Sequence, residues 1–80
     1  MDSISKFGNR VRQLRINCGW SQEELADRTG LHRTYISGVE RGTRNPTITV
    51  VFKFAQAFSM SPSDLLMTKD KYETPESPAN

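Results

Sequence analysis

Apolar residues near the N-terminus recur at the spacing of a helix. Four of them fall at positions i, i+4, i+7 and i+11, which line one face of an amphipathic helix: Phe7, Val11, Leu14 and Cys18. The spacing predicts a helix from about Ser5 to Asn17, and Gly19 ends it. We expect Cys18 and Trp20 to lie in the core or at its edge, because an isolated cysteine on an apolar face packs as a small hydrophobe.

A second helix is predicted to begin at Ser21. The sequence Ser21-Gln22-Glu23-Glu24 fits a capping box, in which the Ser21 hydroxyl and the Glu24 carboxylate each bind a free backbone N–H. The apolar face is short, consisting of Leu25 and Ala26, and Gly30 is suited to the left-handed turn that closes the helix.

A third helix is predicted from about His32 to Glu40, after a tight turn. Rotation by 100° per residue divides its residues into two faces. Apolar residues point to the core: Leu31, Tyr35, Ile36 and Val39. Polar and cationic residues point outward: Arg33, Thr34, Ser37 and Arg41. Two short helices joined by a glycine-containing turn have the dimensions of a helix-turn-helix.

The residues from Ile48 to Phe52 pose a conflict, because their β-branched side chains favour a strand. Helical spacing extends from Val51 to Phe58, and Thr47 can cap a helix that begins after it, so we predict a helix. A short fifth helix follows the cap and proline pair Ser61-Pro62. We therefore expect one domain over residues 1–68, and a disordered polar tail over 69–80 that has too little apolar surface to fold.

Charge is unevenly distributed along the chain. Residues 1–53 carry nine Lys or Arg against five Asp or Glu, whereas residues 54–80 carry two against four. This asymmetry suits a basic face turned toward a polyanion, although a solvated charged surface is the alternative. One cysteine and one histidine give no metal-ligand cluster, and neither a cofactor motif nor a nucleophile and base pair is present. We expect a cytoplasmic protein that is not an enzyme, with no metal, cofactor, membrane or small-molecule substrate.

The start of the third helix carries the candidates for reading DNA bases. In a helix-turn-helix this turn enters the major groove. The Arg33 guanidinium can pair with guanine, and Thr34 can bind a base or contact a thymine methyl group. Ser37 lies one turn further along, and Gly38 beside it leaves room for DNA to approach.

Other residues are candidates for the DNA backbone or for flanking positions. Gln22 begins the second helix, where the helix dipole favours a phosphate. We place Arg41 and Arg44 beyond the third helix. Their guanidinium groups can bind phosphates or remain solvated. Tyr35 is a core-edge residue or a backbone contact. An acidic Glu40 near DNA requires burial and a partner, and Arg15 is the partner we expect.

Four segments together resemble the Cro/repressor-like, or XRE, helix-turn-helix family, and the likeness covers residues 8–67: Val11-Arg12-Gln13-Leu14-Arg15, Ser21-Gln22-Glu23-Glu24-Leu25-Ala26, Tyr35-Ile36-Ser37-Gly38-Val39-Glu40-Arg41-Gly42 and Arg44-Asn45-Pro46-Thr47. The resemblance implies an all-α, five-helix, lambda-repressor-like DNA-binding domain. It supports the Arg15 to Glu40 salt bridge, the phosphate contact of Gln22, and base reading by Arg33, Thr34 and Ser37.

Within that family the run from Arg33 to Arg41, followed by Arg44-Asn45, resembles the controller proteins of restriction-modification systems. This implies a homodimer on a pseudo-palindromic operator of double-stranded DNA, with Tyr35, Arg44 and Asn45 also at the DNA. RNA polymerase is a further candidate partner. His32 departs from the family, which prefers a small capping residue there, so the third helix is expected to be capped less firmly.

Dimerisation is also favoured on physical grounds, because one helix in one groove recognises few base pairs. Our candidates for the dimer interface are the apolar residues that are least needed inside so small a core: Phe52, Leu65, Leu66 and Met67. They could equally complete the core. The alternative functions are a phage-type repressor, an antitoxin, and a protein-interaction module on the same fold.

Overall fold

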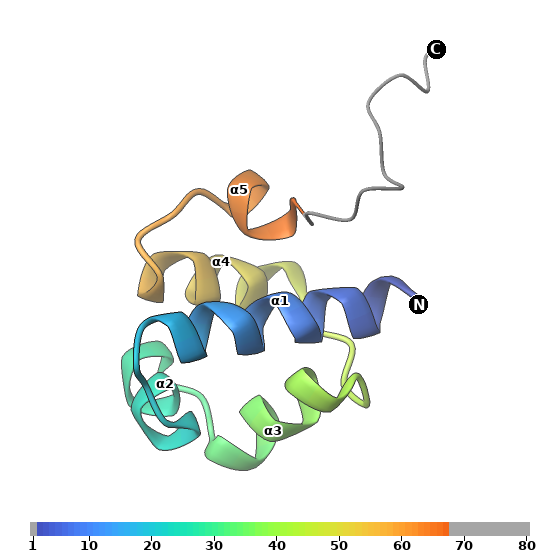
Figure 1. Ribbon diagram of the computed structural model, residues 1–80. Coiled ribbons are helices and arrows are strands. Elements are labelled where there is room, and N and C mark those ends of the chain that lie inside the picture. The colour runs from blue at the N-terminus through green and yellow to red at the C-terminus, as the bar shows by residue number, and fades with distance from the viewer. Residues whose placement is uncertain (1, 68–80) are drawn as a thin grey trace, which may run out of the picture.

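The computed structural model describes residues 2–67, which form five helices and no strand. In chain order these are α1 (Ser3–Asn17), α2 (Gln22–Thr29), α3 (Arg33–Arg41), α4 (Ile48–Ala57) and α5 (Pro62–Leu66). Figure 1 shows α1 across the middle of the domain, with α3 on one side and α4 and α5 on the other. The predicted all-α, five-helix class is confirmed. The predicted tail over 69–80 lies outside the described residues.

Polar side chains begin the helices where the sequence places them. Ser21, Thr47 and Ser61 each accept a hydrogen bond from the backbone N–H three residues later, at 3.0, 3.3 and 3.1 Å. The second half of the predicted capping box is wrong, because the Glu24 carboxylate turns away from Ser21. It accepts instead from Arg28 Nε at 2.8 Å, one turn along the exposed face of α2.

Helix α1 begins two residues before the predicted start. The Asp2 carboxylate accepts the Ser5 backbone N–H at 2.7 Å and so caps the helix. This hydrogen bond favours the ionised carboxylate and holds the pKa of Asp2 below its ordinary value. The signal for this helix therefore includes Asp2, a polar residue that precedes the first apolar position of the helical spacing.

The core is built from one face of each helix. Its largest fully buried side chains are Phe54, Leu25, Ile36, Leu65, Val11 and Val39. Phe7 of α1 packs edge-on against Phe54 of α4, with ring centroids 5.9 Å apart. Trp20 lies at the core edge, where it stacks on Phe58 at 5.6 Å. The prediction for Cys18 is wrong: it is the C-cap residue after the last turn of α1, and it is exposed.

The β-branched segment forms helix α4, as its spacing predicted. Val51, Phe54 and Ala55 are buried on one face, whereas Ile48 and Phe52 are exposed on the other. Tertiary burial at helical spacing thus outweighs the local preference of these residues for a strand.

The turn between α2 and α3 is fixed by its own hydrogen bonds. Gly30 adopts a left-handed conformation with φ of 75° and donates its N–H to the carbonyl of Ala26. The buried Thr29 hydroxyl donates to the Leu25 carbonyl at 2.8 Å and accepts the Leu31 N–H at 3.2 Å. These bonds hold α3 at a defined angle to α2, in the arrangement of a helix-turn-helix.

Candidate nucleic-acid interface

The outward face of α3 starts with two exposed side chains. Arg33 and Thr34 stand in the first turn, and the side chain of neither forms a hydrogen bond or ion pair with another residue in the described range 2–67. Ile36 and Val39, on the opposite face, are fully buried. The predicted division of this helix into a core face and an outward face is therefore present.

Ser37 and Arg41 lie on the same outward face, one turn apart, and are joined directly. Arg41 Nη1 donates a hydrogen bond to the Ser37 hydroxyl. Arg41 is the last residue of α3, whereas we placed it just beyond the helix. The bond leaves the hydroxyl proton of Ser37 available to an acceptor outside the protein.

Arg44 lies back across α3, over the one residue of that helix with no side chain. A Cβ at Gly38 would come within 2.6 Å of Arg44 Cγ, and Gly38 itself is buried. The Arg44 guanidinium carbon is 5.8 Å from the centroid of the Tyr35 ring. The prediction that Gly38 makes room for DNA is therefore wrong, because the space above it holds the stem of Arg44.

The connection after α3 keeps Arg44 in this position. The Thr43 backbone N–H and hydroxyl both donate to the Gly38 carbonyl, at 2.9 and 3.1 Å. Asn45 follows in the same connection and is exposed. Four of the candidates for backbone or flanking contacts therefore lie on α3 or directly after it: Tyr35, Arg41, Arg44 and Asn45.

Arg15, Gln22 and Glu40 come together from three helices. Arg15 Nε and Nη2 donate to the two carboxylate oxygens of Glu40 at 2.7 and 3.0 Å, and its Nη1 donates to the Trp20 carbonyl at 2.8 Å. The hydrogen bonds with Glu40 raise the pKa of Arg15 above its ordinary value. The expected pair of Arg15 and Glu40 is thus present.

A further hydrogen bond to this carboxylate has no signal in the sequence. Gln22 Nε2 donates to Glu40 Oε1 at 3.1 Å, so one N–H of the amide points into the protein. The other N–H and the amide oxygen remain for an outside partner. Gln22 is therefore oriented by a buried carboxylate at the start of α2, the position at which we expect a phosphate.

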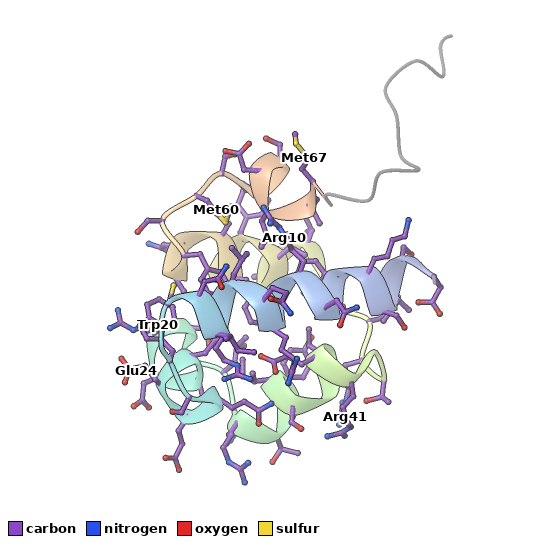
Figure 2. All side chains as sticks on the ribbon, in the orientation of Figure 1. Arg10, Trp20, Glu24, Arg41, Met60 and Met67 are labelled. Carbon is purple, nitrogen blue, oxygen red and sulfur yellow. The ribbon has the colours of Figure 1, made fainter. Side chains whose placement is uncertain are left out.

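An exposed apolar surface lies on the other side of the domain, on α4 and α5. We define the apolar patch as Ile48, Phe52, Leu66 and Met67, which are 68%, 55%, 51% and 56% exposed. Leu66 and Val51 line one shallow hollow, which links the two helices. Figure 2 shows Met67, the residue directly after α5, and Arg41 at the opposite side of the molecule.

The predicted interface set differs from the exposed apolar residues at two positions, one wrongly included and one missed. Leu65 is fully buried in the core and cannot contact another molecule, so that prediction is wrong. Ile48 was missed, although it stands one helical turn before Phe52 on the same exposed face of α4. Its position four residues before Phe52, on the same helical face, is the sequence signal that could have identified it.

Two further properties bear on function. No group of acidic, histidine or cysteine side chains among residues 2–67 is arranged to hold a metal ion. No helix in that range is long and apolar enough to span a membrane.

Comparison with known proteins connects these features to a family. A helix-turn-helix family model matches residues 11–65. The chain is 49% identical over 61 residues to control protein C.BamHI of Bacillus amyloliquefaciens, covering 75% of each chain.

Two solved structures share the fold. The restriction-modification controller protein C.AhdI from Aeromonas hydrophila superposes with a TM-score of 0.75 at 47% identity, covering 78% of this chain and 94% of that one. The controller protein C.Esp1396I, solved as a tetramer with its natural 35-base-pair operator, has a TM-score of 0.75 at 34% identity and covers 81% of this chain and 86% of that one.

Proposed function

Since this chain belongs to the helix-turn-helix family, we propose that it is a sequence-specific transcriptional regulator, the dimeric controller protein of a restriction-modification system. It would act in the cytoplasm on double-stranded DNA with a pseudo-palindromic operator. Support comes from its similarity to C.BamHI and C.AhdI, and from the operator complex of C.Esp1396I.

One observation carries the proposal: the outward face of α3 is polar, cationic and without internal partners at its first turn. Arg33 and Thr34 are exposed there, and the only acidic residue of the helix, Glu40, is buried. A protein-interaction module would have an acidic or apolar face at this position. A face of this kind suits base edges and phosphates instead.

Base reading is assigned to the three outward residues of the first two turns. Arg33 would pair through its two terminal nitrogens with O6 and N7 of a guanine, which is worth about 1–3 kcal/mol of discrimination against a wrong base. Thr34 would bind a base edge or contact a thymine methyl group. Ser37, whose hydroxyl accepts from Arg41, would donate its proton to a base acceptor.

Positioning on the DNA backbone and at flanking bases is assigned to five residues around the same face: Gln22, Tyr35, Arg41, Arg44 and Asn45. Gln22 would bind a phosphate through the amide N–H that Glu40 leaves free, at the positive end of the α2 dipole. Arg44, held over Gly38 and Tyr35, would bring a cation to the end of the recognition helix.

The apolar patch is assigned to the contact between two copies of the chain. Four large apolar side chains that are each more than half exposed are costly on a domain of this size, and two-fold pairing of α4 and α5 would cover them. Helices α4 and α5 lie on the side of α1 opposite to α3 (Figure 1), so two recognition helices would remain free to enter successive grooves.

The experiment that tests the proposal is a selection of random double-stranded DNA by the purified protein. We expect an enriched site with two related half-sites in inverted orientation, with centres about one helical turn, roughly 34 Å, apart or a multiple of it. Enrichment of no sequence, or of a single half-site without a symmetric partner, would contradict a dimeric controller.

A further inference from the structure

Helix α5 and its C-cap residue Met67 carry half of the apolar patch, yet the helix has only five residues, from Pro62 to Leu66. A helix this short has too few internal hydrogen bonds to be stable alone, so its position depends on what anchors it. One anchor is Leu65, which is fully buried against the rest of the core.

The second anchor is Arg10 of α1. Its Nη2 donates to the Asp64 carbonyl at 2.9 Å, and its Nε donates to the Leu65 carbonyl at 3.2 Å. These two carbonyls belong to the last turn of α5, where the negative end of the helix dipole favours a cation. Figure 2 places Arg10 on the side of α1 that faces α5, away from α3 and Arg41.

Two hydrogen bonds from one planar guanidinium to consecutive carbonyls fix both the direction of the α5 backbone and its distance from the guanidinium. The Leu65 carbonyl is part of the peptide bond that joins Leu65 to Leu66. Arg10 therefore determines the direction of the chain at the end of α5, where Leu66 is the last helical residue and Met67 is the C-cap, both more than half exposed.

We infer that Arg10 is a positioning residue for dimerisation, which holds Leu66 and Met67 in place for a second copy of this chain. The inference rests on the proposed dimer and adds to it a polar residue outside the apolar patch. It also separates two surfaces: Arg10 governs the affinity between copies, whereas α3 governs the affinity of each copy for its half-site.

The test compares four full-length proteins: the parent, Arg10→Ala, Arg10→Lys and Arg12→Ala. Arg12 is an exposed arginine of the same helix, so its substitution removes an equal charge and serves as the control. Sedimentation equilibrium without DNA gives the dimer dissociation constant. Titration of a single half-site duplex, at protein concentrations below that constant, gives the affinity of one copy for DNA.

We expect Arg10→Ala to raise the dimer dissociation constant about tenfold or more, because α5 loses two charge-assisted hydrogen bonds. Arg10→Lys, which keeps the charge without the planar pair of donors, should fall between it and the parent. Arg12→Ala should stay within about twofold of the parent for dimerisation, and the half-site affinity of both Arg10 variants should change by less than about twofold.

A double variant separates positioning from a general loss of stability. Once α5 is displaced, Leu66 contributes little to the dimer, so adding Leu66→Ala to Arg10→Ala should weaken dimerisation by much less than Leu66→Ala does alone. Independent effects, with fold-changes that multiply, would overturn the inference.

The remaining outcomes are also decisive. A dimeric parent whose dissociation constant is unchanged in Arg10→Ala would overturn the inference and leave the proposed function intact. A parent that is monomeric at every accessible concentration would overturn both. If Arg10→Ala does not fold, Arg10→Lys decides by the same measurement: a dissociation constant equal to that of the parent overturns the inference, and a raised one supports it.

Discussion

Glu40 of α3 and Arg15 of α1 form a two-pronged ion pair between residues 25 positions apart in the sequence. Both side chains are largely withdrawn from water, with 3% of Glu40 and 13% of Arg15 exposed. The same carboxylate accepts from Gln22 of α2 at 3.1 Å. One buried carboxylate thus connects both helices of the helix-turn-helix to the helix behind them.

Removing this carboxylate should destabilise the fold strongly. We expect Glu40→Ala to lower the free energy of unfolding by about 3–5 kcal/mol, because it leaves a largely buried arginine without its counter-charge. Urea unfolding measures the loss. The matched control is Glu24→Ala, which breaks an exposed pair with Arg28 and should cost about 0.5 kcal/mol or less. Equal costs for the two variants would contradict the account.

The sign of the pH dependence follows from the same pair. Hydrogen bonds with Glu40 raise the pKa of Arg15, so its stabilising charge is fully present below its ordinary pKa and is lost only as pH rises through the higher folded value. The difference in unfolding free energy between Glu40→Ala and the parent should therefore stay constant from about pH 6 to pH 9. A difference that shrank across this range would show that another group is responsible.

Gly38→Ala should lower the affinity for DNA while leaving the stability of the fold nearly unchanged. The added Cβ would come within 2.6 Å of Arg44 Cγ and displace that side chain, whereas alanine favours a helix by up to about 1 kcal/mol. We expect DNA affinity to fall by about tenfold, or about 1.4 kcal/mol, with an unfolding free energy within about 1 kcal/mol of the parent.

The control for this prediction uses Arg44→Ala as the background. If Gly38 acts through Arg44, adding Gly38→Ala to that variant should cost no further DNA affinity. An equal loss in both backgrounds would mean that the methyl group disturbs the DNA contact directly.

His32 offers a gain of stability. It occupies the N-cap of α3 with φ of −74° and ψ of 145°, but its side chain makes no capping hydrogen bond. A serine fits this backbone and would bind a free N–H of the first turn, so His32→Ser should stabilise the protein by about 1 kcal/mol. Thermal unfolding should show the midpoint about 4–8 °C higher. A gain of the same size in His32→Ala would refute the capping explanation.

The elements that the sequence predicts well are those with local causes. Caps and apolar spacing act within one or two turns, which is why the positions of Ser21, Thr47 and Ser61 predict where helices begin. The outward position of Arg33 follows from helix geometry alone.

Apart from the Arg15–Glu40 pair, features that depend on distant parts of the chain are predicted poorly. Cys18 continues the apolar spacing of α1, but it is the C-cap residue of that helix and is exposed. Leu65 and Leu66 look alike in the sequence, and only the packing of α5 buries one and exposes the other. Gly38 gained its role from Arg44, and Arg10 contacts carbonyls 54 and 55 residues away. Sequence spacing carries no information about such contacts.

Gln22 and Arg41 should weaken DNA binding in different ways. Loss of the neutral amide in Gln22→Ala should lower the affinity for all DNA sequences alike and leave the salt dependence unchanged. Arg41→Gln removes a cation, so the slope of log affinity against log salt concentration should fall by about 1. Titrations of one duplex at several salt concentrations distinguish the two. A changed slope for Gln22→Ala, or an unchanged one for Arg41→Gln, would contradict the assigned contacts.

The central claim is that the first turn of α3 reads bases, and Arg33→Ala tests it most directly. The measurement is the affinity of the parent and the variant for the selected operator and for duplexes in which each base pair is changed in turn. We predict that the parent loses about 1–3 kcal/mol of binding free energy when the base pair is changed at one symmetric pair of positions. Arg33→Ala should lose this discrimination at those positions and keep it elsewhere. An Arg33→Ala protein that discriminates at every position as the parent does would contradict the account.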